Sequence, residues 1–551
     1  MAKHQPGSTV MFKRVFIVVL TSYFVASCQS QEVEPAIPET PRDTTITVSN
    51  AFNRLKLDSQ TVMRFIDSAG ITDTAYMLIR NFYNSRNYQY AWFDEKGLTE
   101  HASMLWNLYQ DYDAYAVNAP ASDTLLKNHL QDWLTDTTTV IKPEVARTIE
   151  LKLTKLFFDY AFAKYLGNLN PAELQWHIPR RKVDVSALLD TLVSGSKYDG
   201  HDWEPLHPQY RLLREKLVFY SKMAGKGKWD SISLGARKKL EAGDKDSIIV
   251  NVKTKLQLLG LFPSDDSSAV FTKELKDSLI QFQQQFGVTA NGVIGPATIA
   301  QLNVPFRQRI QQIMINMERM RWLPRQPQGA WILANIPSFR LQVFEGDSIA
   351  LRMNIIVGTS ATKTVIFSDE LKYVVFSPYW NVPASIVRNE ILPEMRKNPN
   401  YLARSRMEKT GMSNGLPVIR QLPGANNALG EVKFLFPNNY NIYLHDTPIK
   451  SYFKETNRAF SHGCIRISDP FALAQFLLRN DTTWTDKKIR AAMSAGKEKW
   501  VTLTGHVPVF ITYFTAWVDR EGRLQFRNDV YGHDKRMAER LFMKSTTLAA
   551  K

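Results

Sequence analysis

YLHDTPIKSYFKETNRAFSHGCIR, residues 443–466, is the stretch that decides how the rest of this 551-residue chain is understood. Fifteen residues separate His445 from the run Ser461-His462-Gly463-Cys464. Cys464 is one of only two cysteines, so an ordinary disulfide network does not explain it. A thiol nucleophile needs an imidazole that takes its proton, and the backbone N–H groups of a tight glycine turn can face a developing oxyanion. The stretch therefore predicts an enzyme of acyl transfer.

The residue types around the cysteine predict separate roles. A free thiol is only slightly ionised at neutral pH, and a histidine partner can lower the pKa of Cys464 by several units, which supplies the reactive anion. His445 is predicted to be that partner. His462 lies beside the thiol, where it shares the charge or has a purely structural role. A metal site is disfavoured, because His462 and Cys464 are only two positions apart and no further ligand cluster exists.

Four more residues are predicted to complete the site. Arg466 binds a substrate carboxylate in a bidentate manner, or it braces the loop by pairing internally. Tyr443 and Trp380 line the substrate pocket, with packing in the core as the alternative. Ser461 is included among the substrate-binding residues, although local hydrogen bonding is its simplest role.

The front of the chain predicts export. Met11-Phe12-Lys13-Arg14 precedes a mostly apolar run, residues 15–25, which is shorter than the roughly 20 residues that span a bilayer and has the basic start of a secretory signal. The run ends in Val25-Ala26-Ser27-Cys28, which is similar to the sites that lipoprotein signal peptidase reads. This resemblance implies that residues 1–27 are removed and that Cys28 becomes the lipid-modified N-terminus.

A plain signal peptide cut nearby, with Cys28 unused, is the alternative, and either Met1 or Met11 is the start. With both cysteines explained, no disulfide framework remains, although export would permit one. Gln29 is not an acidic retention signal. An exported lipoprotein of the cell envelope, on the periplasmic face of the outer membrane, is therefore the predicted location.

The charge balance indicates an anionic polymer as the partner. The chain has 69 Lys and Arg against 53 Asp and Glu, a formal net charge of +16, and a basic surface attracts anionic chains. Nucleic acid is disfavoured by the secretion signal, and no helix-turn-helix, zinc-finger or RNA-binding motif stands out. A cell-wall polymer rich in carboxylates fits better.

The region before the catalytic stretch is predicted to be helical. Residues 29–50 are rich in Pro, Thr and Glu and predict a flexible tether. Residues 51–247, together with 303–329, predict a helical scaffold domain. In it, residues 148–166 place apolar side chains at helical spacing, and Pro208 opens another helix that runs to about Met223.

Residues 248–302 predict a separate small module of three helices. Helices are expected at 252–260, ended by Gly260, and at 271–286, followed by Gly287, and a third is opened by Pro296. The pattern resembles the three-helix peptidoglycan-binding domain. It departs from that family in the loop before Phe271, where Asp265 to Val270 (DDSSAV) replaces the usual turn. This departure concerns the binding groove rather than the fold.

From residue 330 the apolar period changes to two, which indicates strands. Glu345-Gly346-Asp347 predicts a hairpin turn. Residues 387–410 interrupt the strands with a charged helical insertion. The remaining expected elements are strands at 330–336, 339–345, 351–357, 373–376, 417–420, 441–445, 507–518 and 524–527, and helices at 470–478 and 487–493.

Residues 330–480 resemble the L,D-transpeptidase catalytic domain of the ErfK/YbiS/YcfS/YkuD family, whose signature is an upstream histidine, a spacer and then [ST]HGCxR. With the helical region and the module, the chain resembles the large YcbB-like subfamily, which Asn316–Trp322 and Tyr379–Pro383 also match. The implied fold class is multidomain α+β: a helical scaffold, a peptidoglycan-binding module, and a β-rich catalytic domain with a lid insertion at 387–430. Residues 481–551 are expected to add a helix and a β-hairpin.

The resemblance implies roles and a reaction. Cys464 is the nucleophile and His445 the proton acceptor, whose tautomer is fixed by the backbone carbonyl of Asp446. The N–H groups of Gly463 and Cys464 are expected to stabilise the oxyanion. The implied reaction joins diaminopimelate-containing stem peptides by 3–3 cross-links without a cofactor, while the lid excludes water.

Other outcomes stay open at this stage. The same site could transfer the acyl group to a lipoprotein lysine, a free D-amino acid or water. A protein of another class, an inactive peptidoglycan-binding scaffold lipoprotein, is the further alternative.

Overall fold

The computed structural model describes residues 37–47, 49–51, 53–136, 139–194, 204–225, 229–263 and 265–542. The predicted signal segment and Cys28 lie outside these residues, so the lipid anchor stays a prediction. The described residues fall into two compact units: residues 37–47 with 58–88, and the remainder. Within the described residues, no helix combines the length and the apolar character that crossing a membrane requires.

The smaller unit is built on two helices, α1 (Ser59–Ser68) and α2 (Asp73–Ser85). Asp58 caps α1 by accepting a hydrogen bond from the Thr61 N–H. Thr40, from the predicted tether, donates its N–H to Asn81 Oδ1 at 2.8 Å and accepts from Asn84 Nδ2 at 2.9 Å. Part of the predicted tether is therefore bound to α2, because asparagine amides supply backbone partners that composition does not reveal.

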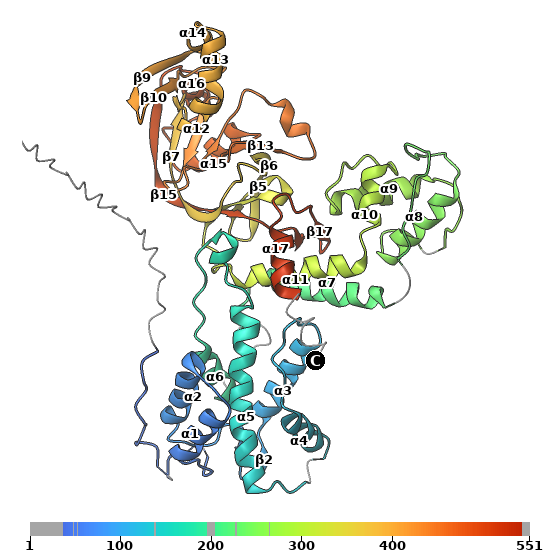
Figure 1. Cartoon of the computed structure of the whole chain (residues 1–551), viewed down its shortest axis with the longest axis vertical. Helices are drawn as coiled ribbons and strands as arrows, with labels where there is room; N and C mark the ends of the chain where they lie inside the picture. Colours follow the sequence, from blue (N-terminus) through green and yellow to red (C-terminus); the bar gives the residue numbers. More distant parts are fainter. Residues whose placement is uncertain are drawn as a thin grey trace, which may run out of the picture. The chain divides into compact units, whose positions relative to one another are not determined.

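The scaffold region of the larger unit is helical, as predicted (Figure 1). Glu150 on its longest helix, fully buried, accepts the N–H groups of Ala91 and Trp92 at 2.7 and 2.9 Å and so fixes a small hairpin. The elements are β1 (Phe93–Asp94), β2 (Gly97–Leu98), α3 (Glu100–Asp113), α4 (Thr124–Thr135), α5 (Pro143–Ala161), its π-helical continuation η1 (Phe162–Leu166), η2 (Ala172–Leu174), β3 (Trp176–His177), α6 (Val185–Val193), α7 (Pro208–Ala224) and α11 (Phe306–Arg321).

The small module has the three predicted helices, α8 (Ser247–Leu258), α9 (Lys273–Gln285) and α10 (Pro296–Leu302), grouped together in Figure 1. Its unusual loop is closed by a buried cation: Lys253 Nζ, 1% exposed, contacts Asp266 at 2.7 Å and the Ser268 carbonyl at 2.8 Å. An ion pair therefore holds the segment in which the family's usual turn is missing.

The catalytic region is a ring of strands. Starting at β7 (Ile366–Phe376), each strand pairs with the next in the following order, and the last returns to β7. The ring contains β11 (Val432–Leu435), β12 (Leu444–His445), β14 (Ile465–Ile467), β6 (Ser348–Gly358), β5 (Arg340–Glu345), β4 (Ala330–Asn335) and β15 (Lys499–Thr512); β13 (Ala459–Ser461) pairs with β6 and β3 with β7.

Two consequences follow from this ring. Because β15 lies between β4 and β7, the barrel extends beyond residue 480, the predicted end of the catalytic domain. Side chains alternate between the inside and the outer wall. The inward ones are at most 1% exposed in β4, β5 and β15: Ile332, Ala334, Leu341, Val343, Val509 and Ile511.

The lid insertion is more than a set of helices. It has its own core of Val382, Ile386, Val387, Ile391 and Ile419 and a three-stranded sheet in the order β8-β10-β9. The sheet and core begin before residue 387, the predicted start. The elements are β8 (Trp380–Asn381), α12 (Ala384–Ile386), η4 (Val387–Ile391), α13 (Leu392–Lys397), α14 (Tyr401–Arg404), β9 (Met407–Ser413) and β10 (Leu416–Gln421).

The C-terminal segment joins the module to the barrel. Arg527 donates to the Gln285 carbonyl of α9 at 2.9 Å, and the rings of Phe286 and Phe526 lie 5.3 Å apart. The remaining elements are η3 (Ile336–Ser338), η5 (Ser451–Lys454), α15 (Pro470–Leu478), α16 (Asp486–Met493), the predicted hairpin β16 (Ala516–Val518) and β17 (Leu524–Phe526), and α17 (His533–Phe542).

Candidate active site

Two short parallel strands bring the predicted histidine and cysteine together. In β12 and β14, Leu444 lies opposite Ile465 and His445 lies opposite Arg466. Leu444 and Ile465 are fully buried inside the barrel. Because opposite residues share a face and successive residues alternate, His445 and Arg466 face the outer wall.

The same alternation places two more residues on that wall. Tyr443 is two residues before His445, and Cys464 is two residues before Arg466. The Ile465 N–H donates to the Tyr443 carbonyl at 3.1 Å, which sets Cys464 beside Tyr443. We call Tyr443, His445, Cys464 and Arg466 the outer cluster. Within it the imidazole and the thiol are diagonal neighbours on one face of the parallel strand pair.

The imidazole of His445 is held by the backbone of the next residue. Its Nδ1 lies within hydrogen-bond distance of the Asp446 carbonyl oxygen, the contact that the sequence predicts. The Asp446 carboxylate has other partners, since it contacts Lys450 Nζ and accepts the Glu431 N–H at 2.9 Å. With Nδ1 donating to a carbonyl, Nε2 is the basic nitrogen.

The thiol of Cys464 is held between neutral partners. Sγ contacts the Asn441 carbonyl at 3.4 Å, and it interacts with the Tyr443 hydroxyl. Burial raises the pKa of the Cys464 thiol, and hydrogen bonding to Tyr443 and the charge of Arg466 oppose this only in part.

The same environment keeps the imidazole uncharged. Burial, followed by the nearby charge of Arg466, lowers the pKa of His445 to about 3. Burial thus disfavours the charged form of both partners. This environment favours a neutral pair over the thiolate that the sequence predicts, because desolvation disfavours both ions.

A glycine turn presents the cysteine. Gly463 has a φ of +119°, a conformation that side chains rarely adopt, although a Cβ there would find only ordinary contacts at 3.8 Å. Ser461, 2% exposed, donates through Oγ to the Cys464 carbonyl at 2.6 Å and accepts the Gly463 N–H at 3.2 Å. These bonds favour local positioning by Ser461 over substrate contact.

The backbone N–H groups of this turn differ in whether another group already accepts their hydrogen bond. The Gly463 N–H, one of the two predicted oxyanion donors, is already bonded to Ser461. The Cys464 N–H has no hydrogen-bond partner anywhere in the part of the chain that the structure describes. Cys464 therefore offers the more readily available donor.

Three residues that sequence reasoning missed brace the turn. Thr364 Oγ1 donates to the Gly463 carbonyl at 2.7 Å, and Thr362 Oγ1 donates to the Ser461 carbonyl at 2.9 Å. The Tyr531 hydroxyl donates to the Gly358 carbonyl at 2.6 Å and accepts the Thr364 N–H at 3.3 Å. Each of these bonds joins residues that lie 99 or more positions apart in the sequence, so no local motif could reveal them.

Arg466 has no internal partner. Among the described residues its guanidinium has no ion pair or hydrogen bond, and its Nε is buried without a partner. Burial lowers its pKa, and the charge of the Cys464 thiolate would raise it. Of the two predicted roles for Arg466, binding a substrate carboxylate fits this environment better than bracing the loop.

His462 reaches the lid. Its Nε2 lies 2.9 Å from Glu390 Oε1 of η4, and the two side chains are 53% and 52% exposed. It therefore connects the turn that contains Cys464 to the lid insertion. Trp380, the other predicted pocket residue, packs against the lid core defined above.

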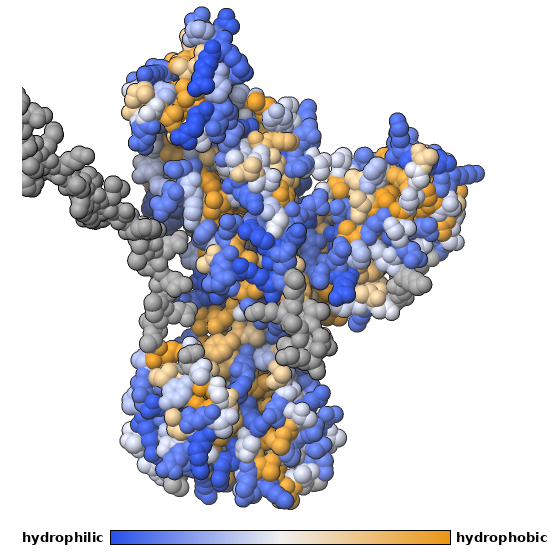
Figure 2. All heavy atoms as spheres, viewed as in Figure 1, coloured by the Kyte–Doolittle hydropathy of each residue, from blue (hydrophilic) through white to orange (hydrophobic). Residues whose placement is uncertain are grey.

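Exposed apolar side chains occur on the segment between His445 and Cys464 and on the lid strands. Ile449, Tyr452 and Phe460, on the segment between His445 and Cys464, are 39–47% exposed, and Met412 and Val418 on the lid strands are 58% and 40% exposed. Hydrophilic side chains predominate on the face shown in Figure 2, with smaller hydrophobic areas between them. In the described part of the chain, no group of three His, Cys, Asp or Glu side chains could hold a metal ion.

Three family models match separate parts of the chain. Residues 329–499 match YkuD, the L,D-transpeptidase catalytic domain; residues 77–217 match a scaffold domain; residues 245–302 match a peptidoglycan binding domain. The first and third matches agree with the two resemblances stated from the sequence.

Individual proteins are similar over shorter parts. A candidate L,D-transpeptidase of Haemophilus influenzae is 32% identical over 243 residues, 41% of this chain and 49% of that protein. The chain thus spans about half the length of this curated relative.

Solved structures of L,D-transpeptidases show weaker likenesses. The one from Xylanimonas cellulosilytica is 12% identical with a TM-score of 0.18, over 50% of this chain and 98% of that chain. The one from Stackebrandtia nassauensis is 15% identical with a TM-score of 0.21, over 50% and 95%. Scores this low establish no shared overall arrangement.

Proposed function

We propose, because this chain contains an L,D-transpeptidase catalytic domain and a peptidoglycan-binding domain, that it joins peptidoglycan stem peptides by 3–3 cross-links through a thioester on Cys464. The observation that carries the proposal is the outer cluster, in which a thiol, a neutral imidazole and an unpaired guanidinium share one face. The predicted envelope location and lipid anchor accompany this proposal as expectations from the sequence.

The first step forms the thioester. As Sγ attacks the carbonyl carbon of the third residue of a donor tetrapeptide, His445 Nε2 takes the thiol proton. The Cys464 N–H donates to the oxyanion, and Gly463 can add a second donor by releasing Ser461. The C–N bond to the terminal D-alanine then breaks, and His445 returns the proton to the leaving amine.

The second step transfers the acyl group. The side-chain amine of diaminopimelate on another stem attacks the thioester carbonyl and gives a proton to His445. The C–S bond breaks, and the sulfur recovers that proton. A neutral imidazole suits both steps, since it can accept a proton each time without first losing one.

Arg466 is expected to bind a donor carboxylate. Replacing Arg466 with glutamine should lower kcat/KM by about 10- to 100-fold, because a hydrogen bond to a charged group contributes about 1.5–3 kcal/mol. The loss should disappear with a donor whose C-terminal carboxylate is amidated. Arg479→Gln serves as the control, because it removes an arginine that is paired with Glu345, and it should change kcat/KM little. An equal loss with the amidated donor would contradict the role of Arg466.

The lid contact is expected to control the choice between amine and water. Glu390→Gln weakens the contact with His462, and exposed ion pairs contribute about 0–1 kcal/mol, so the hydrolysed fraction of product should rise up to about fivefold. Glu394→Gln removes a lid carboxylate that pairs with Lys397 within the lid, and it should leave the product ratio unchanged. Mass spectrometry of products measures the ratio; equal effects of both variants would refute the contact's role.

One experiment separates the proposed reaction from its rivals. Purified protein is mixed with muropeptides, and the products are identified by mass. A 3–3 linked dimer with release of D-alanine is expected. Only shortened peptides, or only D-amino acid exchange, would show that another acceptor is used. No product would favour the binding scaffold without activity.

A further inference from the structure

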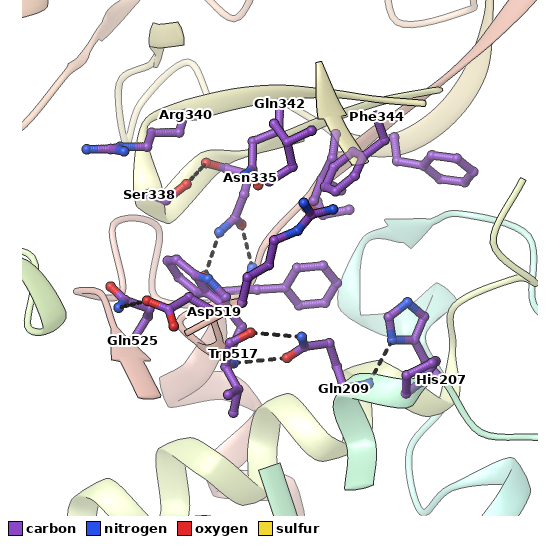
Figure 3. A pocket seen from close by; sticks show the side chains of 18 of the residues that line it. His207, Gln209, Asn335, Ser338, Arg340, Gln342, Phe344, Trp517, Asp519 and Gln525 are labelled. Carbon is purple, nitrogen blue, oxygen red and sulfur yellow. Dashed lines mark hydrogen bonds between the residues drawn. The ribbon is translucent and has the colours of Figure 1, made fainter. Parts of the chain in front are cut away.

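A cavity of about 650 Å³ lies on the outer wall of the barrel, and none of the outer cluster lines it. Its floor is the outward face of β15, β4 and β5. Its sides come from the start of α7, the last turn of α9 and the hairpin β16–β17. Figure 3 shows labelled residues from several of these elements around one space, including Gln209, Gln342 and Trp517.

The floor follows from strand alternation. Trp331, Leu333 and Asn335 line the cavity, while the residues between them, Ile332 and Ala334, are fully buried inside the barrel. The outer face of these strands is thus not covered by a layer of packed side chains but borders open space.

Several walls are preformed. Gln209 exchanges two hydrogen bonds of 2.9 Å with the backbone of Val518, and Asn335 does the same with Phe514 at 3.0 and 2.8 Å (Figure 3). Without a ligand, Gln209 thus joins α7 to the hairpin, and Asn335 joins β4 to the segment that follows β15. A binding site of this kind requires little ordering when it is filled.

The cavity has an excess of positive charge. Six arginines and three carboxylates line it, and two of the carboxylates, Asp519 and Glu521, pair with Arg523 at 3.0 Å. The guanidinium groups of Arg340 and Arg352 have no ion pair or hydrogen bond within the described residues. Unpaired guanidinium groups in a cavity are suited to carboxylates, which they bind in a bidentate manner.

Aromatic rings and amides complete the lining. Trp331 stacks on Phe344 with ring centroids 4.1 Å apart, and the half-buried Trp517 faces the Arg527 guanidinium at 5.0 Å. Flat rings pack against the C–H faces of sugars, and glutamine amides such as Gln342 can bond to hydroxyl and N-acetyl groups. An acidic peptide alone would use the arginines but not the rings.

The cavity lies between the module and the outer cluster. Arg527, in its wall, binds Gln285 of α9. On the other side, Arg340 pairs in register with Asn354, and two residues further along β6, Ile356 pairs with Arg466. Neighbouring strands lie about 4.8 Å apart, so β5 is about 10 Å from β14 along the wall. A polymer in the cavity would therefore lie on the same wall as Cys464, about two strand spacings away.

We infer that this cavity binds the amino-sugar strand of peptidoglycan, with Arg340 and Arg352 pairing carboxylates of the attached stem peptides. The inference rests on the proposed function and adds a substrate site to it. The cavity, rather than the peptidoglycan-binding module, would then be the main contact that positions a glycan strand for reaction.

The test measures binding by full-length protein carrying Cys464→Ala, which prevents turnover. Fluorescently labelled, uncross-linked glycan strands with their stems are the probe, and free tetrapeptide is the second ligand. Arg340→Gln with Arg352→Gln should weaken strand binding by at least about tenfold and leave tetrapeptide binding unchanged. Arg307→Gln, on the exposed side of α11 and outside the cavity, is the control for net charge.

Turnover by the active enzyme separates this inference from the proposed function. The double variant should keep its rate on free tetrapeptides and lose rate on strands. Unchanged strand binding overturns the inference, and so does an equal loss for the free tetrapeptide, which would place the arginines in a peptide site. An equal loss with Arg307→Gln would show general charge attraction and also overturn it. Absence of turnover in the unmodified enzyme would instead refute the proposed function.

Discussion

Replacing Cys464 with alanine is expected to lower cross-link formation at least about 10⁴-fold, because no other group of the outer cluster can hold the acyl group, and loss of a catalytic nucleophile has effects of this size. The covalent adduct with a carbapenem should disappear as well. Binding to isolated cell walls should persist, since the module does not depend on the thiol. Mass spectrometry of the protein and of the products measures all three outcomes.

The second cysteine supplies the control for this experiment. Cys28→Ser removes the only other cysteine of the chain, and it should leave turnover and the adduct intact in purified protein. Turnover by Cys464→Ala would contradict the thioester mechanism. Loss of wall binding in that variant would indicate a damaged fold rather than a missing nucleophile.

Local patterns predicted the elements that carry the chemistry. The alternation in 330–336 and 339–345 corresponds to β4 and β5. Gly346, with a φ of +56°, lies in the turn that joins β5 to β6. The spacing of His445 and Cys464 corresponds to the two ends of a loop between parallel strands. Such features depend on neighbours in sequence, and these a periodic pattern can report.

Features that depend on distant contacts could not be predicted in this way. Thr364 and Tyr531 support the nucleophile turn from other strands and loops, and β15 enters the ring after a gap of many residues. The ionisation of the site was also missed. The sequence shows a histidine near a thiol, but burial, which only the fold determines, shifts both pKa values toward the neutral forms.

Replacing His445 with alanine is expected to lower kcat/KM by about 10²- to 10⁴-fold, the usual contribution of a general base. In the unmodified enzyme, burial lowers the pKa of His445 to about 3, so the imidazole stays unprotonated, and able to accept a proton, as the pH falls from 8 to about 4. Its acid limb should therefore lie well below the ordinary histidine value of about 6.5. At the alkaline end of the pH range, the raised pKa of Cys464 delays formation of the thiolate. Alkylation of the thiol should therefore keep accelerating above pH 9.

The two pH profiles together decide whether the resting site is neutral or an ion pair. kcat/KM is measured from pH 4 to 9 with a soluble tetrapeptide, and circular dichroism at each pH verifies that the fold persists. His506→Gln is the matched control, because this half-exposed histidine pairs with Glu370 away from the outer cluster, and its loss should leave both profiles unchanged. An alkylation profile that levels off below pH 7 and loses that plateau in His445→Ala would establish a thiolate–imidazolium pair. That result would mean that attraction between the two charges exceeds the desolvation that opposes them, and the proton transfer assigned to the first step would then precede substrate binding.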